Sequence, residues 1–131
     1  MRGLWNKLFG DRGERAAVKY LKRQGFRIVS RNYATPWGEI DIVALDGGTI
    51  VFVEVKTRQS IAAGHPFEAV THEKQSKLTR MALVYLKKYK LLEHPARFDV
   101  VSIIWPDGER HPEITHFRNA FEAVGKWQFF S

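Results

Sequence analysis

Two short apolar segments of this sequence carry charged side chains of the kind that bind a metal ion. The segment GEIDIVA contains Asp41, and the segment FVEVKTR contains Glu54 and Lys56. Charged and apolar residues alternate in both segments, which is the pattern of a β-strand with two different faces. Carboxylates at matching points of two strands could hold a divalent cation, beside which the lysine would add a positive charge.

Two adjacent glycines between these segments predict a tight β-hairpin, because a Gly-Gly pair suits a two-residue type I′ turn. This turn would place Asp41 directly opposite Glu54, and Glu39 opposite Lys56. Opposed Cβ atoms lie about 4.5–5.5 Å apart, so the facing carboxylates would repel each other unless one is protonated or a cation lies between them. Oxygen ligands suit Mg²⁺ or Mn²⁺ better than zinc.

A second interpretation stays open, in which Glu39 and Lys56 form an ordinary ion pair on a solvated sheet face. Glu14 favours the metal site, because it falls on the apolar stripe of the helix expected over residues 13–25, where an unpaired acid would be costly. Glu14 could instead be a first-turn residue that the helix dipole stabilises.

The elements that must position these residues alternate along the chain. The sequence predicts a helix over residues 13–25, a strand over 26–33, two strands within 38–58, a loop over 59–70, a helix over 71–92, and strands over 97–105 and 113–121. The second helix would turn inward Leu78, Met81, Ala82, Tyr85, Leu86 and Tyr89. The apolar faces of the hairpin strands would comprise Ile40, Ile42, Ala44, Val51, Val53 and Val55. We expect one domain over residues 1–131, in which residues 1–10 could be a loosely attached segment.

The net charge of +7 is concentrated at the start of the chain, since residues 1–33 hold nine basic and two acidic side chains. Four of the basic residues recur at helical spacing and define a basic stripe: Arg12, Arg15, Lys19 and Lys22. Such a patch indicates an anionic partner, nucleic acid before an anionic membrane, although a solvated face without a partner stays open. The chain has no cysteine, no signal-peptide pattern and no apolar run of membrane-spanning length, so we expect a cytoplasmic protein without a membrane partner.

Several other polar residues receive less weight. The five histidines show no ligand spacing on one element, so zinc is not expected. For Asp99 we favour a structural role in the sheet over a place in the site. Trp37 could stack on a nucleic-acid base, but we favour packing against the core.

The chain resembles the YraN-type family of uncharacterised, predicted endonucleases over about residues 11–123. Five ordered segments carry this resemblance: GERAAVKYLKRQGFRIVSRNY, GEIDIVALDGGTIVFVEVKTR, EAVTHEKQSKLTRMALVYL, RFDVVSI and NAFE. Asp41 followed by Glu54-Val55-Lys56 resembles the D…ExK signature of the PD-(D/E)xK nuclease superfamily, although no Pro-Asp dipeptide precedes the hairpin. A more distant similarity is to archaeal Holliday junction resolvases, which carry a Glu on the first helix.

The resemblance implies an α/β fold with a restriction-endonuclease-like core, a central mixed sheet flanked by helices. It also implies that Asp41, Glu54 and the backbone carbonyl of Val55 bind magnesium (Mg²⁺, or Mn²⁺). Lys56 would position or activate the attacking water and stabilise developing charge.

Two further residues match the family more loosely. Glu14 would correspond to the helical acid of resolvase-like members, and Gln75 to a polar helix residue that some members add to the site.

Two function classes follow. The first is a Mg²⁺-dependent DNA endonuclease that could select branched or junction DNA, for which a homodimer would supply two active sites. The second is a non-catalytic nucleic-acid-binding accessory domain on a nuclease fold.

Overall fold

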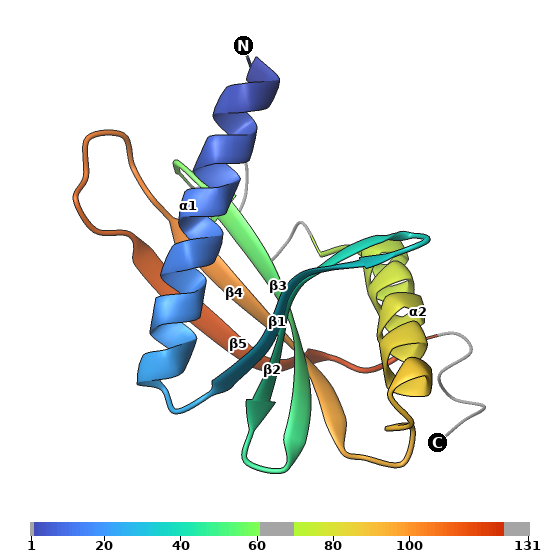
Figure 1. Ribbon diagram of the computed structural model, residues 1–131. Helices are drawn as coiled ribbons and strands as arrows, with labels where there is room; N and C mark the ends of the chain where they lie inside the picture. Colours follow the sequence, from blue (N-terminus) through green and yellow to red (C-terminus); the bar gives the residue numbers. More distant parts are fainter. Residues whose placement is uncertain (1, 61–69, 125–131) are drawn as a thin grey trace.

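The computed structural model describes residues 2–60 and 70–124, which form two helices and five strands. In chain order these are α1 (Arg2–Arg23), β1 (Arg27–Thr35), β2 (Gly38–Asp46), β3 (Thr49–Arg58), α2 (His72–Lys88), β4 (Ala96–Ile104) and β5 (Glu113–Phe121). The strands form one mixed sheet in the order β1-β2-β3-β4-β5. Strands β3 and β4 are parallel and the other neighbours are antiparallel. Helix α2 lies in the β3–β4 crossover, and the two helices cover opposite faces of the sheet (Figure 1).

The face under α1 is covered by the apolar stripe that the sequence predicts. Ala17 and Leu21 are fully buried and pack against side chains of β2, β3 and β4. The helix ends in a Schellman motif, in which Gly25 adopts a φ of +93° and the N–H of Phe26 donates to the Leu21 carbonyl. The helix begins at Arg2, earlier than predicted, so the segment over residues 2–10 forms its first turns rather than a separate tail.

The opposite face is covered by α2, whose predicted inward residues are buried except one. Thr71 caps the start, because its side chain accepts a hydrogen bond from the N–H of Lys74. The prediction that Tyr89 points inward is wrong: Tyr89 follows the last helical residue and is 47% exposed. The loop predicted over residues 59–70 lies largely outside the described residues.

The β2–β3 hairpin has the register predicted from its glycine turn. Asp46 pairs with Thr49, and the ladder continues to Ile42 paired with Val53. Ile40 is the exception to the predicted apolar face, because it packs in the cluster under α2 whereas Ile42 packs under α1. The described β2–β3 pairing ends at Ile42, so the alternation is no longer imposed by the partner strand.

These elements form an α/β fold with a five-stranded mixed sheet flanked by two helices, consistent with a restriction-endonuclease-like core. Neither helix of the described chain is long and apolar enough to cross a membrane.

Candidate functional site

The two predicted acids of the hairpin lie together where the β2–β3 ladder ends. Past Ile42, the Asp41 carboxylate replaces a main-chain acceptor: its Oδ2 accepts the N–H of Val55 at 2.8 Å. The Glu54 carboxylate is buried, with 6% of the residue exposed. The N–H and C=O of one residue in an extended strand point to the same edge, so the Val55 carbonyl is expected to face the β2 side, as its N–H does.

The proximity of the two acids has an electrostatic consequence. The pKa of Asp41 is raised from 3.8 to about 7, first by burial and then by the negative charge of Glu54. The N–H of Val55 lowers it in part, Glu14 raises it further and Lys74 lowers it. The folded protein without a metal therefore favours the protonated form of Asp41, and a cation between the carboxylates would relieve the repulsion from Glu54.

Two lysines contact one oxygen of Glu54. The Lys56 Nζ lies 3.4 Å from Glu54 Oε1, and the Lys74 Nζ lies 3.6 Å from the same atom. The alternative pair of Glu39 with Lys56 does not occur among the ion pairs of residues 2–60 and 70–124, and Glu39 is exposed. Lys74 is not among the site residues predicted from the sequence. The available signal was its place in the first turn of α2, where the helix dipole disfavours a cation.

A cavity of about 660 Å³ opens beside the acids, between the end of β3 and the N-terminal half of α1. The side chains and backbone that line it include Asp41, Val55, Lys56, Asn6, Gly10, Asp11 and Glu14. Helix α1 approaches β3 closely here, because a Cβ at Gly13 would collide with the side chain of Thr57. This close approach places the helical acid beside the hairpin.

Glu14 occupies the α1 wall of this cavity and is 7% exposed. Burial raises its pKa, while Arg31 of β1, whose Nη2 lies 3.4 Å from Glu14 Oε1, opposes the shift. Glu14 lies well inside a helix that begins at Arg2, so the first-turn alternative is wrong.

Gln75 takes a different place from the cavity-lining residues. Its Nε2 donates to the carbonyl of Val70 at 3.2 Å, which ties the start of α2 to the preceding chain. Within the described chain it is not part of the cavity wall, and the adjacent Lys74 makes the contact with Glu54.

Three of the four residues of the basic stripe line a second groove, of about 410 Å³, on the other side of α1. They are Arg12, Arg15 and Lys19, and they are joined there by Arg23 of α1 and Arg110 of the β4–β5 connection. The guanidinium of Arg12 lies 3.6 Å over the ring of Trp105, which holds its charge in place. Lys22 is exposed and lies outside the groove wall, so Arg23 replaces it as the fourth helical cation.

The acids at the hairpin end fit a hard divalent cation. Residues 2–60 and 70–124 contain no cluster of three or more His, Cys, Asp or Glu side chains that could enclose a metal. Two carboxylates and a main-chain carbonyl are nevertheless an oxygen donor set, and Mg²⁺ commonly uses one or two carboxylates and keeps several waters. Asp41, Glu54 and Val55 could provide that set.

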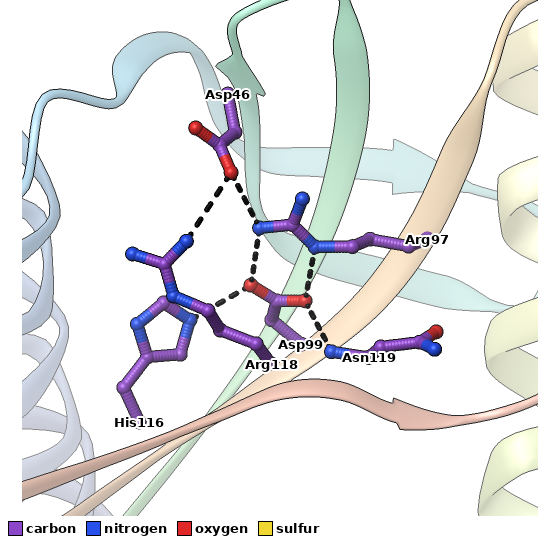
Figure 2. A network of polar contacts seen from close by, with 6 residues as sticks. All are labelled: Asp46, Arg97, Asp99, His116, Arg118 and Asn119. Atoms are coloured by element: carbon purple, nitrogen blue, oxygen red, sulfur yellow. Dashed lines mark hydrogen bonds and ion pairs between the residues drawn. The ribbon is translucent and has the colours of Figure 1, made fainter.

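Asp99 lies in a separate network, as expected from the sequence. Its fully buried carboxylate accepts hydrogen bonds from Arg97, His116 and the N–H of Asn119. Figure 2 shows this network linking β4, β5 and the turn end of β2, where Asp46 joins it. The hairpin therefore carries acids at both ends, and Asp46 at the turn end belongs to this structural network.

The fold and site define a class: an α/β protein with a restriction-endonuclease-like core and a carboxylate–lysine cluster at the open end of its central hairpin. The model of the uncharacterised protein family UPF0102 matches residues 13–103, so the chain belongs to the UPF0102 (YraN-type) family. A UPF0102 protein of Geotalea uraniireducens is 51% identical over 119 residues, covering 91% of this chain and 93% of that protein. One from Geobacter metallireducens is 50% identical over 121 residues, covering 92% and 98%. One from Rhodopirellula baltica is 44% identical over 128 residues, covering 95% and 77%.

Proposed function

We propose that this protein is a metal-dependent endonuclease that hydrolyses DNA phosphodiester bonds. Its active site would contain Asp41, Glu54 and Lys56. One observation supports this proposal above all. The carboxylates of Asp41 and Glu54 lie close together beside Lys56, where the β2–β3 ladder ends next to a cavity. The Asp41 pKa of about 7 reflects first the burial of its carboxylate and then the negative charge of Glu54, and a structural sheet face gains nothing from such a conflict.

In this proposal Asp41, Glu54 and the Val55 carbonyl hold Mg²⁺ (or Mn²⁺). The bound ion would lower the pKa of a water and polarise a phosphoryl oxygen. Lys56 donates a hydrogen bond to the attacking water or a phosphate oxygen, and its charge opposes the negative charge that develops there. Glu14 adds a third carboxylate on the α1 wall that can orient a water.

The substrate and partner expectations are part of the same proposal. The three residues of the basic stripe that line the groove, Arg12, Arg15 and Lys19, would bind phosphates irrespective of sequence. Five expectations stay predictions: selection of branched or junction DNA, a homodimer, a catalytic role for Gln75, a similarity to Holliday junction resolvases and a cytoplasmic location.

A non-catalytic nucleic-acid-binding domain is the second candidate, and one observation favours it. The groove that contains Arg12, Arg15 and Lys19 lies on the opposite side of α1 from the acids. Binding in that groove would not require the carboxylates to hold a metal.

A panel of labelled substrates tests the proposal. Duplex, flap, junction and single-stranded DNA, with matching RNA, would be incubated with Mg²⁺, Mn²⁺ or EDTA. We expect cleavage of at least one DNA substrate with either metal and none with EDTA. Binding without cleavage of any member would establish the accessory-domain alternative.

Separate variants should divide catalysis from binding. Replacing Lys56 with Ala should abolish cleavage and leave DNA affinity nearly unchanged, since one charge is lost beside the acids. Charge reversal at Arg15 and Lys19 should weaken binding to all sequences, and the slope of log affinity against log salt should flatten by roughly 0.9 per lost duplex contact. Titrations at several salt concentrations and one cleavage assay measure both effects.

Reversing the charge of Lys22 provides the matched control, because Lys22 lies on the same helix outside the groove wall. Cleavage by Lys56→Ala at the parent rate would refute the role of the ExK lysine. An unchanged salt slope in the Arg15 and Lys19 variants would mean that the stripe is only a solvated surface.

A further inference from the structure

A groove beside α2 combines an exposed tryptophan with three basic side chains. It has a volume of about 580 Å³ and lies between the β1–β2 turn and the first half of α2. Trp37 of the turn is 44% exposed and lines the groove opposite Lys74, Lys77 and Arg80 of α2. Glu73 is an acidic side chain in the same lining, so these named residues together carry a net positive charge.

Two hydrogen bonds stabilise the backbone of the turn that carries Trp37. The Thr35 hydroxyl donates to the Gly38 carbonyl at 2.8 Å and accepts the N–H of Trp37 at 3.2 Å. Gly38 adopts a φ of +134°, and a Cβ there would lie 3.3 Å from the Lys77 ammonium. Trp37 therefore stands on a braced turn next to a cation, and the core-packing role favoured from the sequence is not observed.

One residue of the groove also contacts an acid of the candidate metal site. Lys74 lines the groove and places its Nζ 3.6 Å from Glu54 Oε1. From Lys74 to Arg80 the helix axis extends about 9 Å at 1.5 Å per residue, so the far end of the groove lies within a short distance of the lysine that contacts Glu54.

An indole stacks on a base only when a face of that base is free, and duplex bases are stacked on one another. Aromatic side chains beside a positively charged groove are typical of proteins that bind single strands. We infer that this groove binds an unpaired nucleic-acid segment, with a base on Trp37 and phosphates on Lys77 and Arg80. The inference rests on the proposed function in one respect: the strand would continue past Lys74 to the acids.

Binding measured without metal tests the groove separately from catalysis. A labelled homopyrimidine DNA strand, the RNA strand of the same sequence, and a duplex of equal length would be titrated in EDTA by fluorescence anisotropy. Replacing Trp37 with Ala should weaken single-strand binding about fivefold or more, the lower end of what a stacked base contributes. Trp37→Phe should recover most of this affinity, because it keeps an aromatic face, and duplex affinity should change less than about twofold.

Two lysines of α2, one inside the groove and one outside it, provide a matched comparison. Lys77→Gln should flatten the single-strand salt slope by roughly 0.7, whereas Lys87→Gln, an exposed lysine outside this groove, should leave it unchanged. Comparison of the DNA strand with the RNA strand shows which sugar the groove accepts. Tighter binding of either single strand than of the duplex supports the inference. Absence of binding to both strands by the parent, equal losses for single strand and duplex in Trp37→Ala, or parental single-strand affinity in that variant would overturn it.

The result also separates the two proposals. A Trp37 effect in EDTA, with no cleavage of any substrate in Mg²⁺, would leave the groove established and the nuclease proposal refuted. Metal-dependent cleavage with no Trp37 effect would do the reverse.

Discussion

Replacing Asp41 with Asn should abolish metal-dependent cleavage and, at the same time, make the metal-free protein more stable at pH 8. A loss of about a thousandfold or more in cleavage is expected if the metal loses one of its two carboxylate ligands. The gain in stability is expected because the amide removes a charge that is disfavoured first by burial and then by the nearby Glu54. Replacing an acid that has only a structural role would not produce both effects together.

The sign of the stability change follows from the pKa of Asp41. Its folded value of about 7 lies above its ordinary value of 3.8, so the folded state favours the protonated carboxyl. The parent therefore loses stability as pH rises from about 4 to about 7, and Asn at this position does not titrate. We expect Asp41→Asn to gain roughly 1–2 kcal/mol of stability at pH 8, and this gain should vanish near pH 4.

Saturating Mg²⁺ should reverse the order of stability. The parent would gain stability by binding the ion, while Asp41→Asn would gain little. Urea unfolding at pH 4 and pH 8, with Mg²⁺ or EDTA, and Mn²⁺ calorimetry measure these changes. Glu39→Gln is the matched control, because it removes an exposed carboxylate from the same strand. Unchanged Mn²⁺ affinity in Asp41→Asn would exclude Asp41 as a ligand.

The site could be predicted from the sequence as far as local geometry determines it. The glycine turn and the alternation define the hairpin register, and that register brings Asp41 and Glu54 together. The apolar stripe of α1 likewise places Glu14 toward the sheet. These contacts follow from strand pairing and helical periodicity, which short segments specify.

The remaining features depend on how the elements pack. Lys74 reaches Glu54 only because the β3–β4 crossover sets α2 beside the strand end, and no spacing within α2 specifies that distance. Ile40 departs from its predicted face where the described pairing of β2 with β3 has ended. Trp37 is exposed because the β1–β2 turn that carries it lines a groove rather than packing on the core.

Replacing Arg97 with Met should destabilise the protein by about 3–5 kcal/mol, the usual consequence of leaving a buried charge without its partner. Arg97 donates to Asp99 from Nε at 2.9 Å and from Nη2 at 3.2 Å, and to Asp46 at 2.9 Å. Asp99 is fully buried, so in the variant its charge would retain only the His116 and Asn119 hydrogen bonds described here. Arg118→Met is the matched control, since Arg118 is 51% exposed and contacts Asp46 at 3.4 Å.

The pH dependence of this loss should be opposite to that of Asp41. Burial alone would raise the pKa of Asp99, but hydrogen bonds from His116, Arg97 and Asn119 outweigh it and hold that pKa below 3.8. The ionised network therefore stabilises the fold above pH 3.8, and its contribution is lost as pH falls through the lower folded value. The difference between parent and Arg97→Met should be full at pH 7 and should shrink in strong acid.

A double variant distinguishes an unpaired charge from lost packing. Adding Asp99→Asn to Arg97→Met removes the charge left behind, so part of the lost stability should return. Urea unfolding with an unchanged m-value measures both steps, and no recovery would mean that packing of the arginine stem, rather than charge, explains the loss. Because this network lies at the turn end of the hairpin and the candidate metal ligands at the other, the folded fraction of Arg97→Met should cleave at the parental rate.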